Sequence, residues 1–163
     1  MPAMSKTEIA ERVIAAIGPD VREHGPFDEN PFLIEIDGAV PLAIFPFTIT
    51  NPPGGRHASE LKIQLIAPGQ ARDEPGNFAP PPGRWPILLG YSEFYDRFVL
   101  WEAQKHVDFG WSKNCQVRIQ VLSDAQISGI ANMDRNLHGG LRETIIAARP
   151  DHLADALKKR IKP

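Results

Sequence analysis

The stretch Glu60–Ala67 reads E-L-K-I-Q-L-I-A and places an acid, a base and an amide at alternate positions. An apolar period of two predicts a β-strand with one buried face. The polar side chains on the other face are Glu60, Lys62 and Gln64. Their types allow three interpretations: the E-x-K end of a metal-dependent nuclease site, a row of groups that hydrogen-bond to nucleic acid, or an ordinary solvated sheet face.

The nuclease interpretation needs a further acid, because carboxylates would hold Mg²⁺ while the lysine positions the attacking water. Asp37, at the end of another predicted strand, would join Glu60 and Lys62 in that catalytic set. Mg²⁺ is the only cofactor that this interpretation requires, and the other interpretations require none. The pattern is not specific, because E-x-K is frequent on amphipathic strands and Gly38 after Asp37 is typical of a turn.

Other catalytic patterns are missing from the sequence. The five histidines are scattered and form no HNH-like pair, and no G-x-S-x-G elbow or phosphate-binding lysine motif occurs. The single cysteine, Cys115, excludes zinc sites of the CxxC type, and its place on an apolar strand face predicts a core residue. We therefore predict no metal site apart from the Mg²⁺ alternative.

A second predicted strand, residues 115–122, also alternates and exposes Gln116, Arg118 and Gln120. Glutamine and arginine side chains match the edges of adenine and guanine in the major groove. If the two strands are neighbours, their outward side chains form one polar face that could read bases. Loops beside it offer groups for the phosphate backbone or a flipped base. These loop residues are Arg56, Lys105, His106, Trp111 and Lys113.

The elements that must position these groups follow from periodicity and turn signals. A capping box, Ser5 to Glu8, predicts a first helix that ends at Gly18-Pro19. Further strands are predicted over 32–36, 42–50, 85–91, 97–103 and 142–148, with prolines 41 and 46 making the second of these an edge or bent strand. Residues 68–86 form a Pro-rich loop, Ser123 caps a short helix to Ala131, 132–140 is a loop, and Pro150 opens the last helix.

Length and charge limit the possible classes of protein. The 163 residues suit one domain, 1–163, and the absence of crossover helices predicts an α+β fold with a mainly antiparallel, barrel-like sheet. The net charge of −2 restricts any nucleic-acid contact to a local basic surface. No apolar run is long enough for a membrane span, and residues 1–7 lack an apolar signal core, so we expect a cytoplasmic protein without a membrane partner.

Several motifs, in order, resemble those of bacterial restriction-type endonucleases with a C-terminal HNH domain and of methylase-associated restriction-system proteins. Gly55-Arg56 followed by residues 59–64 resembles G-R…D-E-Y-K/R-I-Q, and residues 87–91 resemble L-L-L-G-Y. Residues 98–106 resemble F-V-A-W-D..K-H, 116–118 resemble Q-V/I-R, and 143–151 resemble E-I-x-x-A-F-R-P-D. The chain departs from the pattern at residues 59–61 and at Glu102, where the pattern has D-E-Y and Asp.

The resemblance implies a DNA-recognition module whose cutting chemistry lies in a separate HNH part, and a B3-like pseudobarrel by analogy. Because arginine can replace the lysine of E-x-K in that pattern, the resemblance also argues against the nuclease site. We expect a double-stranded DNA-binding recognition domain of a restriction-modification or defence system, with a nuclease or methylase as a further partner. The alternatives are a small Mg²⁺-dependent nuclease and a protein-interaction or oligomerisation module.

Overall fold

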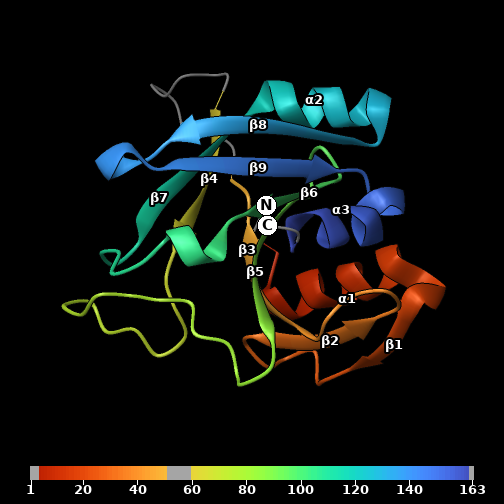
Figure 1. Cartoon of the computed structure of the whole chain (residues 1–163), viewed down its shortest axis with the longest axis horizontal. Helices are drawn as coiled ribbons and strands as arrows, with labels where there is room; N and C mark the ends of the chain where they lie inside the picture. Colours follow the sequence, from red (N-terminus) through yellow and green to blue (C-terminus); the bar gives the residue numbers. More distant parts are fainter. Residues whose placement is uncertain (1–3, 51–59, 162–163) are drawn as a thin grey trace.

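The computed structural model describes residues 4–50 and 60–161, and its strands form two sheets (Figure 1). The seven-stranded sheet has the order β1 (Val21–His24), β2 (Phe32–Ile36), β3 (Leu42–Thr48), β5 (Trp85–Ser92), β6 (Arg97–Trp101), β9 (Arg142–Ala148) and β8 (Ile130–Asn136). The second sheet pairs β4 (Glu60–Leu65) with β7 (Lys113–Arg118). Every pair is antiparallel except β3 with β5. With helices α1 (Lys6–Ile17), α2 (Ile119–Ser128) and α3 (Leu153–Arg160), the predicted α+β class is confirmed.

The two sheets meet at one antiparallel bridge just after β3. The Thr50 amide donates to the Lys62 carbonyl at 2.9 Å, and the Lys62 amide donates back at 3.3 Å. Hydrogen-bonded neighbours therefore run from β8 through β9, β6, β5 and β3 to β4 and β7. In the described part of the chain, β7 and β8 form no ladder with each other. The sheet is barrel-like with one open side, and we call the space between β7 and β8 the seam.

Two apolar cores explain why the central strands are apolar on both faces, as the sequence predicts. Phe45, Ile63 and Trp101 belong to the core inside the barrel-like sheet. Ile44 and Leu100 face the other way and join the core that includes residues of α1 and α3. Each fully buried aliphatic or aromatic side chain of this size contributes roughly 1.5–3 kcal/mol by leaving water. Both terminal helices thus hold one face of the sheet while its other face holds β4 and β7.

The prediction for residues 115–140 is wrong in three places. The strand ends at Arg118, α2 begins at Ile119 without the predicted Ser123 capping box, and residues 130–136 form β8 instead of a loop. Val121 and Ala125, four positions apart, are buried on one face of α2, and this helical packing outweighs the apolar alternation. Gly129, at φ +86°, ends the helix in a conformation that glycine adopts without strain.

The prolines predict that β3 is an edge or bent strand, and it is an edge on the β2 side only beyond Ile44. β3 lies between β2 and β5, but β2 pairs only with Leu42 to Ile44. Pro46 lies beyond that pairing, so its missing amide hydrogen costs no bond to β2. The carbonyl of Pro46 accepts a hydrogen bond from the Lys6 ammonium at 2.5 Å, which attaches α1 to the strand.

Candidate nucleic-acid interface

The two polar strands predicted from the sequence are neighbours. β4 and β7 pair so that Glu60 lies opposite Arg118, Lys62 opposite Gln116 and Gln64 opposite Asn114. Opposite residues of an antiparallel pair project on the same side, so all six side chains share one face. We call this set the polar face. Its members are Glu60, Lys62, Gln64, Asn114, Gln116 and Arg118.

The other side of the same two strands is core. Leu61 lies opposite Val117 and Ile63 opposite Cys115, and all four side chains are buried. Because a strand alternates, the apolar side fixes which residues point outward, and a shift of one residue would bury the polar face. On the outer side, Lys62 donates a hydrogen bond to Asn114 Oδ1 at 3.1 Å. The buried core on the other side of the two strands therefore fixes the orientation of the polar face.

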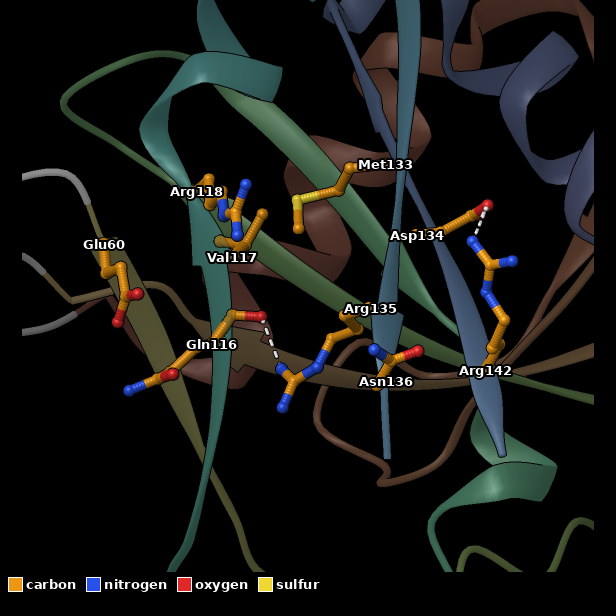
Figure 2. A pocket seen from close by; sticks show the side chains of 9 residues that line it. All are labelled: Glu60, Gln116, Val117, Arg118, Met133, Asp134, Arg135, Asn136 and Arg142. Atoms are coloured by element: carbon orange, nitrogen blue, oxygen red, sulfur yellow. Dashed lines mark hydrogen bonds and ion pairs between the residues drawn. The ribbon is translucent and has the colours of Figure 1, made fainter. Parts of the chain in front are cut away.

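A groove of about 270 Å³ lies along the seam, next to the polar face (Figure 2). β7 forms one wall and β8 the other, with Glu60 and Arg142 at the outer sides. Half-buried Met133 supplies apolar surface, while Val117, which also lines the groove, is buried. The lining residues are Glu60, Gln116, Val117, Arg118, Met133, Asp134, Arg135, Asn136 and Arg142.

The charges of this groove are three guanidinium groups and two carboxylates. Arg135 crosses the seam and donates to the Gln116 carbonyl at 2.9 Å, and the Trp101 indole donates to the same oxygen at 3.3 Å. Asp134 is engaged from β9, because Arg142 donates to it at 3.0 Å and Thr144 at 2.8 Å. With three cations against two anions, the lining of the groove carries a net charge of +1, which favours an anionic ligand.

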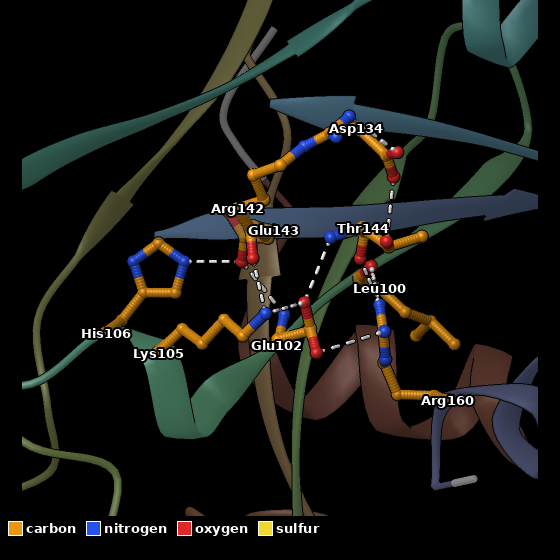
Figure 3. Close-up of polar contacts among 9 residues, drawn as sticks. All are labelled: Leu100, Glu102, Lys105, His106, Asp134, Arg142, Glu143, Thr144 and Arg160. Atoms are coloured by element: carbon orange, nitrogen blue, oxygen red, sulfur yellow. Dashed lines mark hydrogen bonds and ion pairs between the residues drawn. The ribbon is translucent and has the colours of Figure 1, made fainter. Parts of the chain in front are cut away.

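A buried cluster of His106, Cys115 and Glu143 lies in the core behind β7 (Figure 3 shows His106 and Glu143). His106 Nε2 is 2.6 Å from Glu143 Oε2 and 3.9 Å from the Cys115 sulfur. Glu143 Oε2 also accepts from the Glu102 amide at 2.9 Å, whereas Glu143 Oε1 and His106 Nδ1 have no hydrogen-bond partner among the described residues. This cluster connects β7, β9 and the 3₁₀ turn Ala103–Lys105 behind the polar face.

The geometry of the cluster does not suit nucleophilic catalysis. A cysteine–histidine–carboxylate triad uses opposite nitrogens of the ring, but here both contacts go to Nε2. Burial, reinforced by the Glu143 carboxylate, raises the pKa of the Cys115 thiol and keeps it protonated. The 2.6 Å separation of Nε2 and Oε2 is that of a hydrogen bond. Two ligand atoms of one tetrahedral zinc ion would lie roughly 3.3 Å apart, so Nε2 and Oε2 do not have the spacing of two zinc ligands.

A second network beside the cluster ties β6 to β9 (Figure 3). Glu102 accepts from the Thr144 amide at 2.9 Å and pairs with Lys105 at 3.0 Å and Arg160 at 3.6 Å. Burial tends to raise the pKa of Glu102, but these donors and cations outweigh it and hold the pKa below its usual range. Glu102 is therefore an ionised anchor between α3 and the sheet.

Some of the predicted site residues lie elsewhere. Gln120 is in the first turn of α2, where its amide donates to Asp124 at 2.8 Å, so it is not on the polar face. His106 is buried and does not present its ring at the surface, contrary to the prediction of a loop contact. Lys105 donates to the Arg142 carbonyl as well as pairing with Glu102.

The remaining predicted contacts surround the polar face or lie outside the described residues. Lys113 begins β7 and is exposed, and Trp111 is half-buried in the turn before it, with Arg72 over its ring at 5.6 Å. Arg56 lies outside the described residues. Asp37 follows β2 in the seven-stranded sheet and pairs with Arg22 at 3.5 Å, while Glu60 and Lys62 lie on β4 in the other sheet.

Sequence reasoning missed the half of the groove that β8 and β9 supply. Arg135, Asn136 and Met133 fall in the stretch predicted as a loop, where aspartate and asparagine disfavour strands. The alternation of Met133 and Arg135 against Asp134 and Asn136 was the only available signal, and its inward phase contains a charge. Asn114 was missed because the predicted strand began one residue later.

The features described so far define an α+β domain with an open barrel-like sheet that carries a polar strand pair beside an arginine-lined seam. A sequence model of the family described as methylase-associated X1 matches residues 40–157, and the chain belongs to this family. The match spans β3 to β9 and therefore includes the polar face and the groove. No curated protein and no solved structure matches the chain. None of the helices in the described ranges has the length and apolar character to cross a membrane.

Proposed function

We propose that this chain is a double-stranded DNA-binding recognition domain that acts in a restriction-modification setting. The observation that carries the proposal is the pairing of β4 with β7, which gathers the six polar side chains on one side of a rigid two-stranded sheet. A two-stranded β-ribbon fits the major groove of B-form DNA. The reading residues in this proposal are Lys62, Gln64, Asn114, Gln116 and Arg118.

The residue types on the polar face support base reading over a plain solvated surface. Glutamine and asparagine can bond adenine through two atoms, and arginine and lysine can do the same with guanine. Lys113 and Trp111, beside the start of β7, are placed for the phosphate backbone. The polar face and the adjoining groove also supply the local positive charge that a protein of net charge −2 needs for this role.

The family description supports the setting and the partner. A domain that is associated with methylases would direct a modification or cleavage enzyme to its site, so we propose a methylase, or a nuclease of the same system, as the protein partner. The Mg²⁺ nuclease hypothesis gains no support from the geometry. Its three residues are divided between two sheets, and Asp37 already pairs with Arg22.

A binding selection from a random duplex pool, with and without cytosine methylation, tests the proposal. Gln116→Ala should then lower affinity for the selected duplex by about 1–3 kcal/mol, the range for a side chain that reads a base. Gln120→Ala is the matched control, because the same side chain bonds to Asp124 on α2. Arg118→Ala should weaken binding by a similar amount, and binding itself should weaken steeply as the salt concentration rises.

The alternatives are outcomes of the same experiment. If no duplex binds at low salt, methylated or not, the DNA-binding proposal is wrong. A concentration-dependent oligomer without nucleic acid would then favour the interaction module, and Mg²⁺-dependent cleavage that Lys62→Ala abolishes would favour the nuclease.

A further inference from the structure

The seam is the one place where the barrel-like sheet of the described residues is open beside the polar face. β7 and β8 are end strands of their sheets, and α2 connects the end of β7 to the start of β8. Among the described residues no backbone ladder joins the two strands, and the Arg135 side chain crosses between them to the Gln116 carbonyl (Figure 2). A ligand at the polar face can therefore extend into the groove without breaking a ladder.

The chemistry of the groove combines three features that a single nucleotide requires. Arg118 and Arg142 are the cations at its two sides. Arg142 pairs with Asp134 at 3.0 Å, whereas Arg118 makes no hydrogen bond or ion pair to any residue in the described ranges. The half-buried side chain of Met133 offers apolar surface to the face of a base, whereas Val117 lines the groove but is itself buried in the core. Asn136 contributes an amide that can bond to a base edge.

Its size and its apolar surface distinguish this groove from a surface that only contacts phosphate. A volume of about 270 Å³ is close to the lower limit of small-ligand pockets, roughly 300 Å³, and suits one nucleotide better than a longer segment. A phosphate contact requires charge but no apolar interior, whereas a base taken out of the stack requires both. Met133 is unbranched and can adjust to the shape of a flat ring.

We infer that the groove between β7 and β8 holds one DNA nucleotide whose base has left the duplex stack, while the polar face contacts the bases that remain paired. This inference rests on the proposed DNA binding. It gives the domain a way to inspect a single base on all its edges, since a base inside the duplex exposes only its groove edges.

The test uses the selected duplex with one 2-aminopurine opposite an abasic site, which lowers the cost of taking the base out of the stack. The fluorescence of 2-aminopurine is quenched by stacking, and none of the residues that line the groove in the described structure is aromatic. Binding should therefore raise the fluorescence several-fold. Met133→Arg, which fills the groove without adding an aromatic ring, should abolish the rise, and Met133→Leu is the size-matched control that should keep it.

A second measurement keeps the inference falsifiable if Met133→Arg does not fold. The methyl NMR signal of Met133 should shift when a deoxynucleoside 5′-monophosphate is added and should not shift with inorganic phosphate. Equal shifts with both would show a phosphate site only, which overturns the inference. Duplex binding without a fluorescence rise also overturns it but leaves the proposed function intact, whereas absence of duplex binding removes both.

Discussion

His106→Ala should destabilise the protein strongly although the ring contacts no predicted ligand. The Glu143 side chain is fully buried, and among the described residues its Oε2 has two hydrogen-bond partners, His106 Nε2 at 2.6 Å and the Glu102 amide at 2.9 Å. Removing the ring leaves this buried group with one partner. Leaving a buried polar group without its partner costs about 1–3 kcal/mol, and more when the group is charged. That is a large share of the roughly 5–15 kcal/mol by which a domain is usually stable.

Urea unfolding measures this cost, provided that the slope of the transition stays the same. Lys105→Ala is the control, because Lys105 is one position away but its partner Glu102 is partly exposed, and such pairs contribute about 0–1 kcal/mol. Replacing both His106 and Glu143 by leucine should recover most of the loss, since neither side chain then leaves the other unpaired. A loss below about 1 kcal/mol for His106→Ala would refute the assignment of the pair as a buried brace.

Three further outcomes test other parts of the fold. Burial, followed by the hydrogen bond to Asp96, raises the pKa of Tyr91 from 10.0 to about 12. The free energy of unfolding should therefore fall between pH 10 and 12, because only the unfolded chain loses this proton there. Tyr91→Phe should remove that slope when unfolding is measured as a function of pH. Gly90→Ala should cost about 1–3 kcal/mol by chemical denaturation, because the added Cβ would lie 2.8 Å from Trp101. Ile63→Ala should lower the free energy of unfolding by about 2–5 kcal/mol, while its exposed neighbour Gln64→Ala should leave stability unchanged and weaken only DNA binding in a gel shift.

The sequence was informative wherever one face of an element is apolar and the other polar. Ser5 and Glu8 form the predicted capping box, and the alternation of Leu61 and Ile63 with polar residues predicted β4 correctly. Pairing of β4 with β7 was open at the sequence level, because the strands are separated by about fifty residues and nothing in a single sequence fixes a long-range partner. In the structure the two strands pair, so their polar side chains share one face.

The sequence did not decide between strand and helix where the apolar spacing fits both periods. Cys115, Val117, Ile119 and Val121 alternate like a strand, yet the chain turns into α2 after Arg118. In the structure, the first two of these side chains fill the barrel core from β7, while Val121 fills it from the helix. The helix thus buries Val121 in the same core without a continuation of β7.

This change from strand to helix is also what creates the candidate site. Because β7 stops at Arg118, α2 can cross to the start of β8 and leave the seam open beside the polar face. Arg135 and Gln116 then span the opening by one hydrogen bond instead of a ladder. A fully paired β7 and β8 would have closed the sheet and filled the groove. The polar face predicted from Glu60, Lys62 and Gln64 thus adjoins a groove whose second wall depends on which strand ends remain unpaired, and the alternation within residues 133–136 does not fix that.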